Sequence, residues 1–167
     1  MKIAGVMHES IVDGPGVRFV VFAQGCPHRC PGCHNPETWP RGGGEEWSVR
    51  DLFRIIRKAP DYVQGLTLSG GEPFLQAGEM ADLAALARKR NLSVATYTGY
   101  VYDDILEMAA KDADISRLLE ETDILVDGPF VEKMKDISLR FRGSANQRVI
   151  DLKASREQGA AVLLPEG

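Results

Sequence analysis

The sequence has only three cysteines among its 167 residues, and all of them lie in the segment 26–33. Because structural disulfides need paired cysteines distributed along the chain, this scarcity argues against a disulfide framework. Basic residues are not in excess either: the formal net charge is −4, and Lys and Arg are scattered. Since binding to nucleic acid or to an anionic membrane usually needs a basic face, we expect neither as a partner.

Long apolar runs are also missing from the sequence. No run approaches the length of a membrane-spanning helix, and residues 1–10 lack the apolar stretch of a signal peptide. A reducing compartment suits thiols that hold a metal, so we expect the protein in the cytoplasm. With 44% hydrophobic and 26% charged residues, the chain fits a single globular domain over 1–167.

What the sequence does contain is an alternation of strand-like and helical segments. The segment Val17–Ala23 is rich in β-branched and aromatic residues, as buried strands are. Ser48 is a typical N-cap for the apolar helical pattern that follows it, and Pro60 ends that pattern. These patterns predict an α/β protein with a mostly parallel sheet. The expected strands are 17–23, 66–68, 93–98 and 123–127, the expected helices are 49–59, 77–90, 102–111 and 115–121, and 139–150 is expected to hold an edge strand with a loop.

A distinctive motif follows each of the four expected strands. The cysteine segment follows the first, Ser69–Pro73 follows the second, Thr98 ends the third before Gly99–Tyr100, and Asp127 ends the fourth. Because the carboxyl ends of parallel strands meet at one edge of a sheet, we expect these motifs to come together there. Asp127 is compatible with two roles, a turn cap or a ligand of a cation or cofactor.

The cysteines have the spacing C-x3-C-x2-C, at Cys26, Cys30 and Cys33. Three thiols this close favour a shared metal centre over disulfides. A four-iron cluster usually takes four thiolates, so three would leave one iron with an open position. An open iron is a place where a ligand can bind and react.

Three other interpretations of the same segment remain open. Cys30–His34 reads C-x-x-C-H, the attachment signature of c-type haem, although haem attachment normally implies export and leaves Cys26 unexplained. His28 or His34 could complete a Cys3His zinc site, although structural zinc usually takes two ligand pairs separated by a longer insert. A dithiol redox pair would use only the last two cysteines.

The whole string Gly25–Trp39 resembles the glycyl-radical-activating branch of the radical S-adenosylmethionine (SAM) superfamily. The resemblance implies a [4Fe-4S] cluster held by Cys26, Cys30 and Cys33, with SAM bound at the open iron. It also implies cleavage of SAM to methionine and a 5′-deoxyadenosyl radical. Since the cofactors carry this chemistry, we expect no side chain to act as a catalytic acid, base or nucleophile.

The resemblance implies further contacts with SAM. Gly70, Gly71 and Glu72 match the glycine-rich motif that holds the methionine ammonium of SAM, mostly through the backbone. Without the cysteines, the same residues would be interpreted as a tight connection between a strand and a helix. Thr98 is well placed for a ribose hydroxyl, and Tyr97 and Tyr100 either border the nucleoside or are packing residues.

The adenine of SAM is implied to lie beside the third cysteine, near Gly32, Cys33 and His34. Many members of the superfamily carry an aromatic residue just before this cysteine, and this chain has Gly32 instead. A contact with adenine must therefore come from the backbone of Gly32 or from His34.

The resemblance extends to the fold and to the substrate. Segments 126–130 and 139–150 resemble the activating proteins of anaerobic ribonucleotide reductases, so the resemblance covers residues 8–152 and leaves the tail 153–167 unassigned. The implied fold is a partial, open (β/α) barrel, because a closed barrel typically takes about 250 residues. The implied partners are the anaerobic ribonucleoside-triphosphate reductase, which would lose a glycine Cα hydrogen, and an electron donor such as flavodoxin or ferredoxin.

Two rival functions belong beside this hypothesis. An activase for another glycyl radical enzyme, such as pyruvate formate-lyase, shares the cysteine string, but such activases generally run longer, and the segment Arg142–Ser144 also disfavours this assignment. A non-enzymatic zinc or haem-binding module is the more distant alternative. Colour separates these classes, because an iron–sulfur protein is brown, a zinc protein is colourless and haem gives a sharp Soret band.

Overall fold

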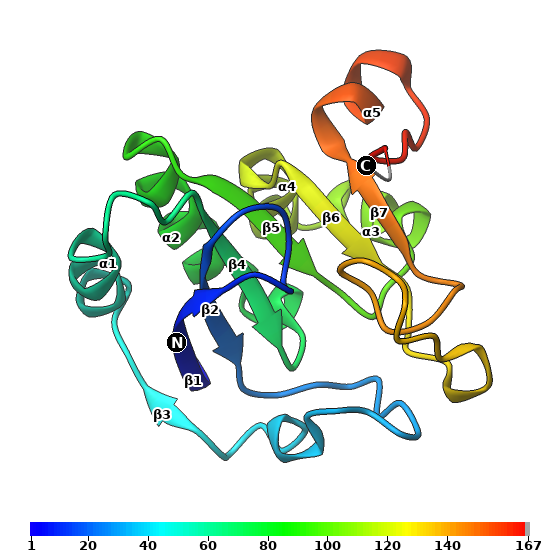
Figure 1. Ribbon diagram of the computed structural model, residues 1–167, viewed down its shortest axis with the longest axis horizontal. Coiled ribbons are helices and arrows are strands. Elements are labelled where there is room, and N and C mark those ends of the chain that lie inside the picture. The colour runs from blue at the N-terminus through cyan, green and yellow to red at the C-terminus, as the bar shows by residue number, and fades with distance from the viewer. Residues whose placement is uncertain (166–167) are drawn as a thin grey trace.

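The computed structural model describes residues 1–165. The strands among them form one seven-stranded sheet (Figure 1). The strands are β1 (Lys2–Ser10), β2 (Arg18–Ala23), β3 (Glu45–Glu46), β4 (Gly65–Gly70), β5 (Ser93–Tyr97), β6 (Ile124–Asp127) and β7 (Arg148–Asp151). Their order in the sheet is β3-β1-β2-β4-β5-β6-β7. The central strands β2, β4, β5 and β6 run parallel, whereas β1, β3 and β7 pair antiparallel. The expected α/β class is confirmed, and the sheet is parallel in its centre only.

Five α-helices connect or follow these strands. They are α1 (Val49–Arg57), α2 (Ala77–Lys89), α3 (Tyr102–Ala109), α4 (Ala113–Glu121) and α5 (Leu152–Gln158). The Ser48 side chain caps α1 as predicted, because it accepts a hydrogen bond from the backbone N–H of Asp51 at 3.0 Å. Short 3-10 helices span Pro36–Thr38, Pro73–Gln76 and Glu132–Met134.

The apolar core lies between the sheet and the helices α1 to α4. Leu66, Leu68 and Val94 project from the central strands into one buried cluster with Leu52 of α1 and Leu83 of α2. These alternate strand positions leave the other side chains on the opposite face of the sheet. In Figure 1 α2, α3 and α4 lie behind the central strands and α1 lies at their left, whereas the loop between β1 and β2 crosses in front of the sheet and the loop after β2 runs below it.

The predicted central elements are confirmed, and three elements at the margins of the sheet are new. Strand β1 was not predicted because it ends in the polar run His8–Ser10 and much of it is exposed, so it lacks the alternating apolar pattern of a strand. Strand β3 has only two residues. Helix α5 lies in the unassigned tail, and Leu163 beyond it forms a bridge with Ile150 of β7. Residues 166–167 of the predicted domain and tail lie outside the described residues.

A buried arginine joins the amino ends of the central strands by hydrogen bonds. Arg18, at the start of β2, is 1% exposed. Its guanidinium donates to the hydroxyls of Thr67 at 2.7 Å and Ser93 at 2.9 Å. It also donates to the backbone carbonyls of Pro15, Leu66 and Ser93, at 2.9 to 3.0 Å. Burial lowers the pKa of this guanidinium to about 10, so it stays charged at neutral pH.

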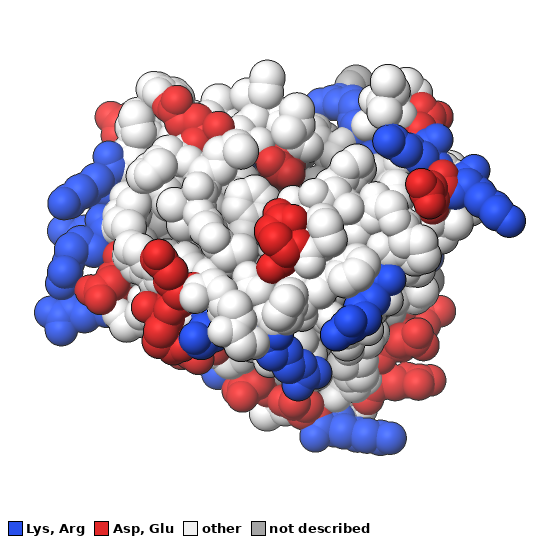
Figure 2. Space-filling model, turned by 90° about the horizontal axis from the view of Figure 1, so that it is seen from below, with Lys and Arg blue, Asp and Glu red and all other residues white. Residues whose placement is uncertain are grey.

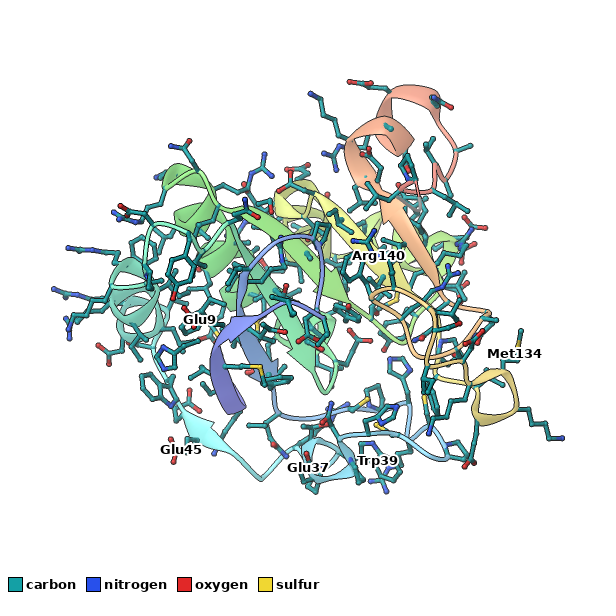
Figure 3. The ribbon with its side chains drawn as sticks, viewed as in Figure 1. Glu9, Glu37, Trp39, Glu45, Met134 and Arg140 are labelled. Atoms are coloured by element: carbon teal, nitrogen blue, oxygen red, sulfur yellow. The ribbon has the colours of Figure 1, made fainter. Side chains whose placement is uncertain are left out.

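A long excursion, residues 128–147, connects β6 to β7 beside the carboxyl ends of the strands. Gln147 holds its base, because the side-chain amide donates to the Gly128 carbonyl at 3.1 Å and accepts from the N–H of Gly143 at 2.9 Å. Figure 3 shows Met134 at the outer tip of the excursion and Arg140 on the part that returns toward the strands. Among residues 1–165, no helix combines the length and apolar character needed to cross a membrane.

Candidate functional site

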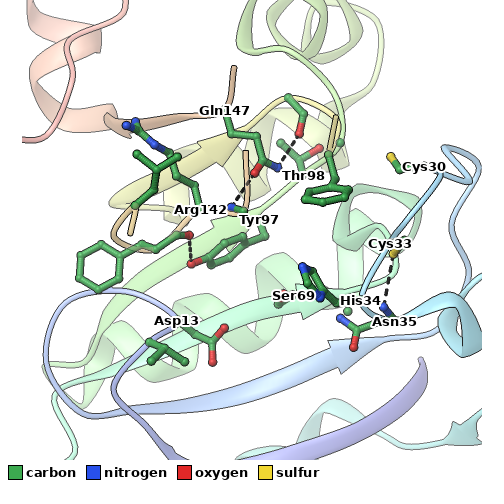
Figure 4. Close-up of a pocket in the computed structure, with 18 of the residues that line it drawn as sticks. Asp13, Cys30, Cys33, His34, Asn35, Ser69, Tyr97, Thr98, Arg142 and Gln147 are labelled. Atoms are coloured by element: carbon green, nitrogen blue, oxygen red, sulfur yellow. Dashed lines mark hydrogen bonds between the residues drawn. The ribbon is translucent and has the colours of Figure 1, made fainter. Parts of the chain in front are cut away.

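A cavity of about 640 Å³ opens at the carboxyl ends of the central strands. Its walls come from the segments at the ends of β2, β4 and β5, from the turn before β2, and from the excursion 128–147 that follows β6. Figure 4 shows Cys30 and Cys33 toward one end of the cavity and Tyr97 and Arg142 toward the other. The predicted site residues that line it are Cys26, Cys30, Cys33, His34, Gly70, Gly71 and Thr98.

The cysteine loop is held by its own backbone. The N–H groups of Gly25 and Cys26 donate to the carbonyls of Thr38 at 2.6 Å and Trp39 at 3.1 Å, which closes the loop at its base. Inside the loop, the N–H of Cys33 donates to the Cys30 carbonyl at 3.1 Å. All three thiols are free and half-buried. Glu37 and Trp39, beyond the cysteines, lie below the sheet in Figure 3.

Burial raises the pKa of the Cys26 thiol above its ordinary value. Hydrogen bonds from the backbone N–H groups of His28 and Arg29 act in the opposite direction, because they favour the thiolate. The Cys33 sulfur accepts a hydrogen bond from the N–H of Asn35 at 3.4 Å. Backbone donors therefore already point at two of the three sulfurs.

The glycine motif packs directly on the base of the cysteine loop. Gly71 and Glu72 donate their N–H groups to the carbonyls of Ala23 and Gly25, both at 2.8 Å. Gly70 has a φ of +91°, and a Cβ added to Gly71 would lie 2.3 Å from the Gly25 carbonyl oxygen. The fold itself thus requires glycine here, because any side chain would separate β4 from the cysteine loop.

Glu72 is fully buried and accepts hydrogen bonds at both carboxylate oxygens. Its Oε1 contacts His28 Nε2 at 2.6 Å, Thr98 Oγ1 at 2.7 Å and the Gly99 N–H at 2.9 Å. Its Oε2 accepts from the N–H of Phe74 at 3.0 Å. Glu72 is not among the residues that line the cavity, so its carboxylate lies behind the wall and not on it.

Two other predicted residues have specific surroundings. Thr98 borders the cavity, but its hydroxyl donates to Glu72 and accepts from the N–H of Tyr100 at 3.1 Å. Gly32 is not among the lining residues, and it has a φ of +76°. This positive φ disfavours any side chain at position 32, and a Cβ there would also lie 2.9 Å from the Glu132 carboxyl carbon of the excursion.

Further residues line the cavity, among them Phe130 and Asp13, which were not assigned a role from the sequence, and Tyr97, which was interpreted either as bordering the nucleoside or as a packing residue. The Phe130 ring packs edge-on against His34, with centroids 5.4 Å apart, and both line the cavity. The Tyr97 hydroxyl donates to the Phe141 carbonyl, and burial raises the pKa of Tyr97. Asp13 lines the cavity from the turn before β2. Of Phe130 and Asp13, only Phe130 could have been expected at the cavity from the sequence, because it lies three residues after the end of β6.

Asp127 has a structural role in this arrangement. It is 1% exposed, accepts from the N–H of Tyr102 at 2.8 Å, and forms an ion pair with Arg148 at 2.6 Å. The carboxylate therefore caps the start of α3 and joins β6 to β7. Asp127 does not border the cavity, which favours the turn-cap interpretation over the ligand interpretation.

Comparison with known proteins agrees with these features. Residues 12–150 match the family model described as a 4Fe-4S single cluster domain. The chain is 35% identical to the anaerobic ribonucleoside-triphosphate reductase-activating protein of Salmonella typhimurium, over 86% of this chain and 94% of that protein. The protein of the same name from enterobacteria phage T4 is 33% identical, over 83% and 86%. The chain belongs to the 4Fe-4S single cluster family of radical SAM activating proteins.

A pyruvate formate-lyase-activating enzyme, from Listeria monocytogenes, is also similar to the chain. It is 36% identical over 86% of this chain but only 59% of the enzyme. The family's cofactors are a [4Fe-4S] cluster and SAM.

The donor set of this radical SAM protein fits a cluster. No three Cys, His, Asp or Glu side chains among residues 1–165 are gathered around a single-ion site. Each thiolate of a cubane binds a different iron, so the sulfurs only need to border a common space. Cys26, Cys30 and Cys33 do so, because all of them line the cavity.

Proposed function

We propose that the chain activates an anaerobic ribonucleoside-triphosphate reductase by generating a glycyl radical in it. The observation that carries the proposal is the cavity, in which three free thiols, the Gly70–Gly71 edge and the His34–Phe130 pair border one space. The similarity to reductase-activating proteins supports the choice of substrate, since it extends over most of both chains. When bound, the reduced cluster and SAM supply a 5′-deoxyadenosyl radical that abstracts a glycine Cα hydrogen.

The residues at one end of the cavity hold the cluster in this proposal. Cys26, Cys30 and Cys33 are its ligands, and the N–H of Asn35 stabilises the charge on the Cys33 sulfur. The half-buried loop limits access of water and oxygen to the cluster. A reducing compartment, the cytoplasm, keeps the thiols available, and an electron donor such as flavodoxin or ferredoxin approaches from solvent.

The residues in the middle of the cavity would hold SAM in this proposal. The backbone edge of Gly70 and Gly71 would bind the methionine ammonium, and His34 with Phe130 would border the adenine. Thr98 can only accept a hydrogen bond from a ribose hydroxyl, because its own hydrogen is donated to Glu72. Gly32 can contact SAM only through its backbone. Glu72 does not line the cavity, so it can affect SAM binding only through the residues that it contacts.

The sheet serves as a partial, open (β/α) barrel in this proposal. The central strands in Figure 1 point downward or to the lower right, so Figure 2 shows their carboxyl ends. Much of this face is uncharged in Figure 2: acidic side chains appear near its middle, and most of the other charged side chains lie toward its margins. Ile11, Val12 and Ile137 are exposed at the border of the cavity. Such an open mouth allows a polypeptide to place its glycine within about 3 to 3.5 Å of the reacting atom.

Activation of a pyruvate formate-lyase is the second candidate function. The similarity to the Listeria enzyme supports it, but the chain spans only 59% of that enzyme's length. The decisive experiment mixes the reconstituted, reduced chain with SAM and either a reductase or a lyase. Electron paramagnetic resonance should detect a glycyl radical with the reductase. A radical that forms only with the lyase would overturn the choice of substrate.

A further inference from the structure

We infer that Glu72 and His28 are positioning residues that hold the cysteine loop in register with the SAM-binding edge of the sheet. The inference rests on the proposed function for what the loop and the edge bind. The positioning role itself rests on the contacts of the two side chains. Neither residue is needed as a ligand of the cluster in this arrangement.

The partners of Glu72 come from three segments that follow three different strands. His28 belongs to the loop after β2, Phe74 to the segment after β4, and Thr98 and Gly99 to the segment after β5. These are the segments that carry the cysteines, the glycine motif and the predicted ribose contact. One buried side chain therefore connects all three parts of the site.

The site requires a carboxylate at position 72. Both oxygens of Glu72 accept hydrogen bonds, from three groups at Oε1 and from the Phe74 N–H at Oε2. A glutamine has only one acceptor oxygen, so its NH2 group would face a donor in either orientation. Since Glu72 is 0% exposed, water cannot replace the lost partner.

His28 is held from three sides. Its Nε2 lies 2.6 Å from Glu72, and its ring packs edge-on against Tyr100 with centroids 4.5 Å apart. On the third side is Gly99, where an added Cβ would lie 2.4 Å from the His28 ring. Because His28 lies between Cys26 and Cys30 in the sequence, fixing its ring also fixes the backbone between two cluster ligands.

His28 also lines the cavity, so a direct contact with SAM is the alternative explanation for any effect of its substitution. The two explanations differ in one observable. A positioning residue controls the mobility of the loop before any cofactor is bound, whereas a SAM contact does not. Amide hydrogen exchange of residues 26–34 therefore separates them.

The experiment compares His28→Leu and His28→Gln in the full chain. Leucine removes the hydrogen bond to Glu72, whereas the amide of glutamine can still donate one. Before cluster reconstitution, exchange of residues 26–34 should accelerate about tenfold in His28→Leu and stay near wild type in His28→Gln. After reconstitution, the apparent Kd for SAM, measured from the electron paramagnetic resonance of the reduced cluster, should rise about tenfold in His28→Leu only.

Two further variants keep the test informative. Glu72→Gln should accelerate exchange in residues 26–34 if it folds, and Gly99→Ala should do so by displacing the His28 ring without altering either partner. The control is His8→Leu, which changes an exposed histidine on β1, away from the cavity lining. It should leave both measurements unchanged.

Unchanged exchange in folded His28→Leu and Gly99→Ala would overturn the inference. Weaker SAM binding with unchanged exchange would also overturn it, because His28 would then act by direct contact. Failure of the proposed function is distinguishable: the wild-type chain would not bind SAM after reconstitution, while the exchange difference between variants would still be measurable.

Discussion

Buried charged side chains lie at both ends of the central parallel strands, and two of them, Arg18 and Glu72, have different kinds of partner. At the amino ends, Arg18 donates five hydrogen bonds, mainly to groups within β4 and β5. At the carboxyl ends, Glu72 accepts four hydrogen bonds from the segments that follow the strands. The first arrangement joins elements of the sheet, whereas the second joins the loops around a cavity.

We therefore expect Arg18 to matter mainly for the stability of the sheet and Glu72 to matter mainly for the site. Partners of Arg18 within strands are already ordered by the sheet, so the arginine mainly satisfies buried polar groups. Partners of Glu72 in loops gain their order from the contact, so its loss should affect the site more than the fold. Substitutions at the carboxyl ends should therefore lower activity, and substitutions at the amino ends should lower stability.

Removing one thiol at the carboxyl ends should abolish activity with little change in stability. Cys26→Ala, Cys30→Ala and Cys33→Ala should each eliminate formation of 5′-deoxyadenosine, because two thiolates cannot hold the cluster. Iron content after reconstitution and product formation are the measurements. Ser138→Ala, in the exposed part of the excursion, is the control. Normal turnover in any cysteine variant would contradict the assignment of cluster ligands.

Removing the arginine at the amino ends should instead reduce stability. Arg18→Met leaves two hydroxyls and several carbonyls without a donor, so the free energy of unfolding should fall by about 3 to 5 kcal/mol. Urea unfolding of the cluster-free chain measures this. Arg117→Met is the matched control, because Arg117 is 46% exposed and pairs with exposed Asp82. Equal midpoints in the two variants would show that the amino ends do not carry the stability.

Tyr97 is the last residue of β5, at the carboxyl ends, and its burial predicts a loss of stability at high pH. Burial raises the pKa of Tyr97 above its usual value of 10. Above pH 10 the unfolded chain therefore releases this proton while the folded chain retains it, which lowers the free energy of unfolding by up to about 1.4 kcal/mol per pH unit. Unfolding between pH 8 and pH 11 tests this, and Tyr97→Phe should make the decline shallower. An identical slope in the variant would exclude Tyr97 as the cause.

Thr96 and Thr98, two positions apart at the end of β5, allow a hydrogen bond at the site to be compared with one outside it. Thr98→Val and Thr96→Val should each lower the free energy of unfolding by about 1 kcal/mol, because each removes a buried hydrogen bond. Only Thr98 contacts Glu72, whereas Thr96 contacts Thr122 at 2.9 Å. The affinity for SAM, measured by titration of the reconstituted chain, should therefore weaken only in Thr98→Val, by about threefold. Equal affinities would place Thr98 outside the site.

The central fold was predictable because its signals are local. Apolar strands, the Ser48 cap and Pro60 identify the βα units without knowledge of their partners. The outer strands were not predictable in the same way. Strand β1 is polar at its end, and it is ordered by pairing with β2 on one side and with β3 on the other, where Glu45 and Glu46 lie far from it in the sequence.

The candidate site was predictable in composition but not in its connections. The thiols, the glycine motif and Thr98 were expected at one edge, and they line one cavity. The burial of Glu72, its contact with His28 and the position of Phe130 beside His34 depend on how separate loops pack. Sequence spacing contains no information on such contacts, because each joins residues that follow different strands.

By itself, the sequence determined the class of fold, the three-cysteine spacing and the family that this spacing indicates. These properties depend on the kinds of residue and on their local order. Only the tertiary structure decided that Arg18 joins neighbouring strands of the sheet and that Glu72 joins the loops of the site. Arg18 and Glu72 differ in this respect because one contacts strands and the other contacts loops, and that distinction exists only once the strands have paired.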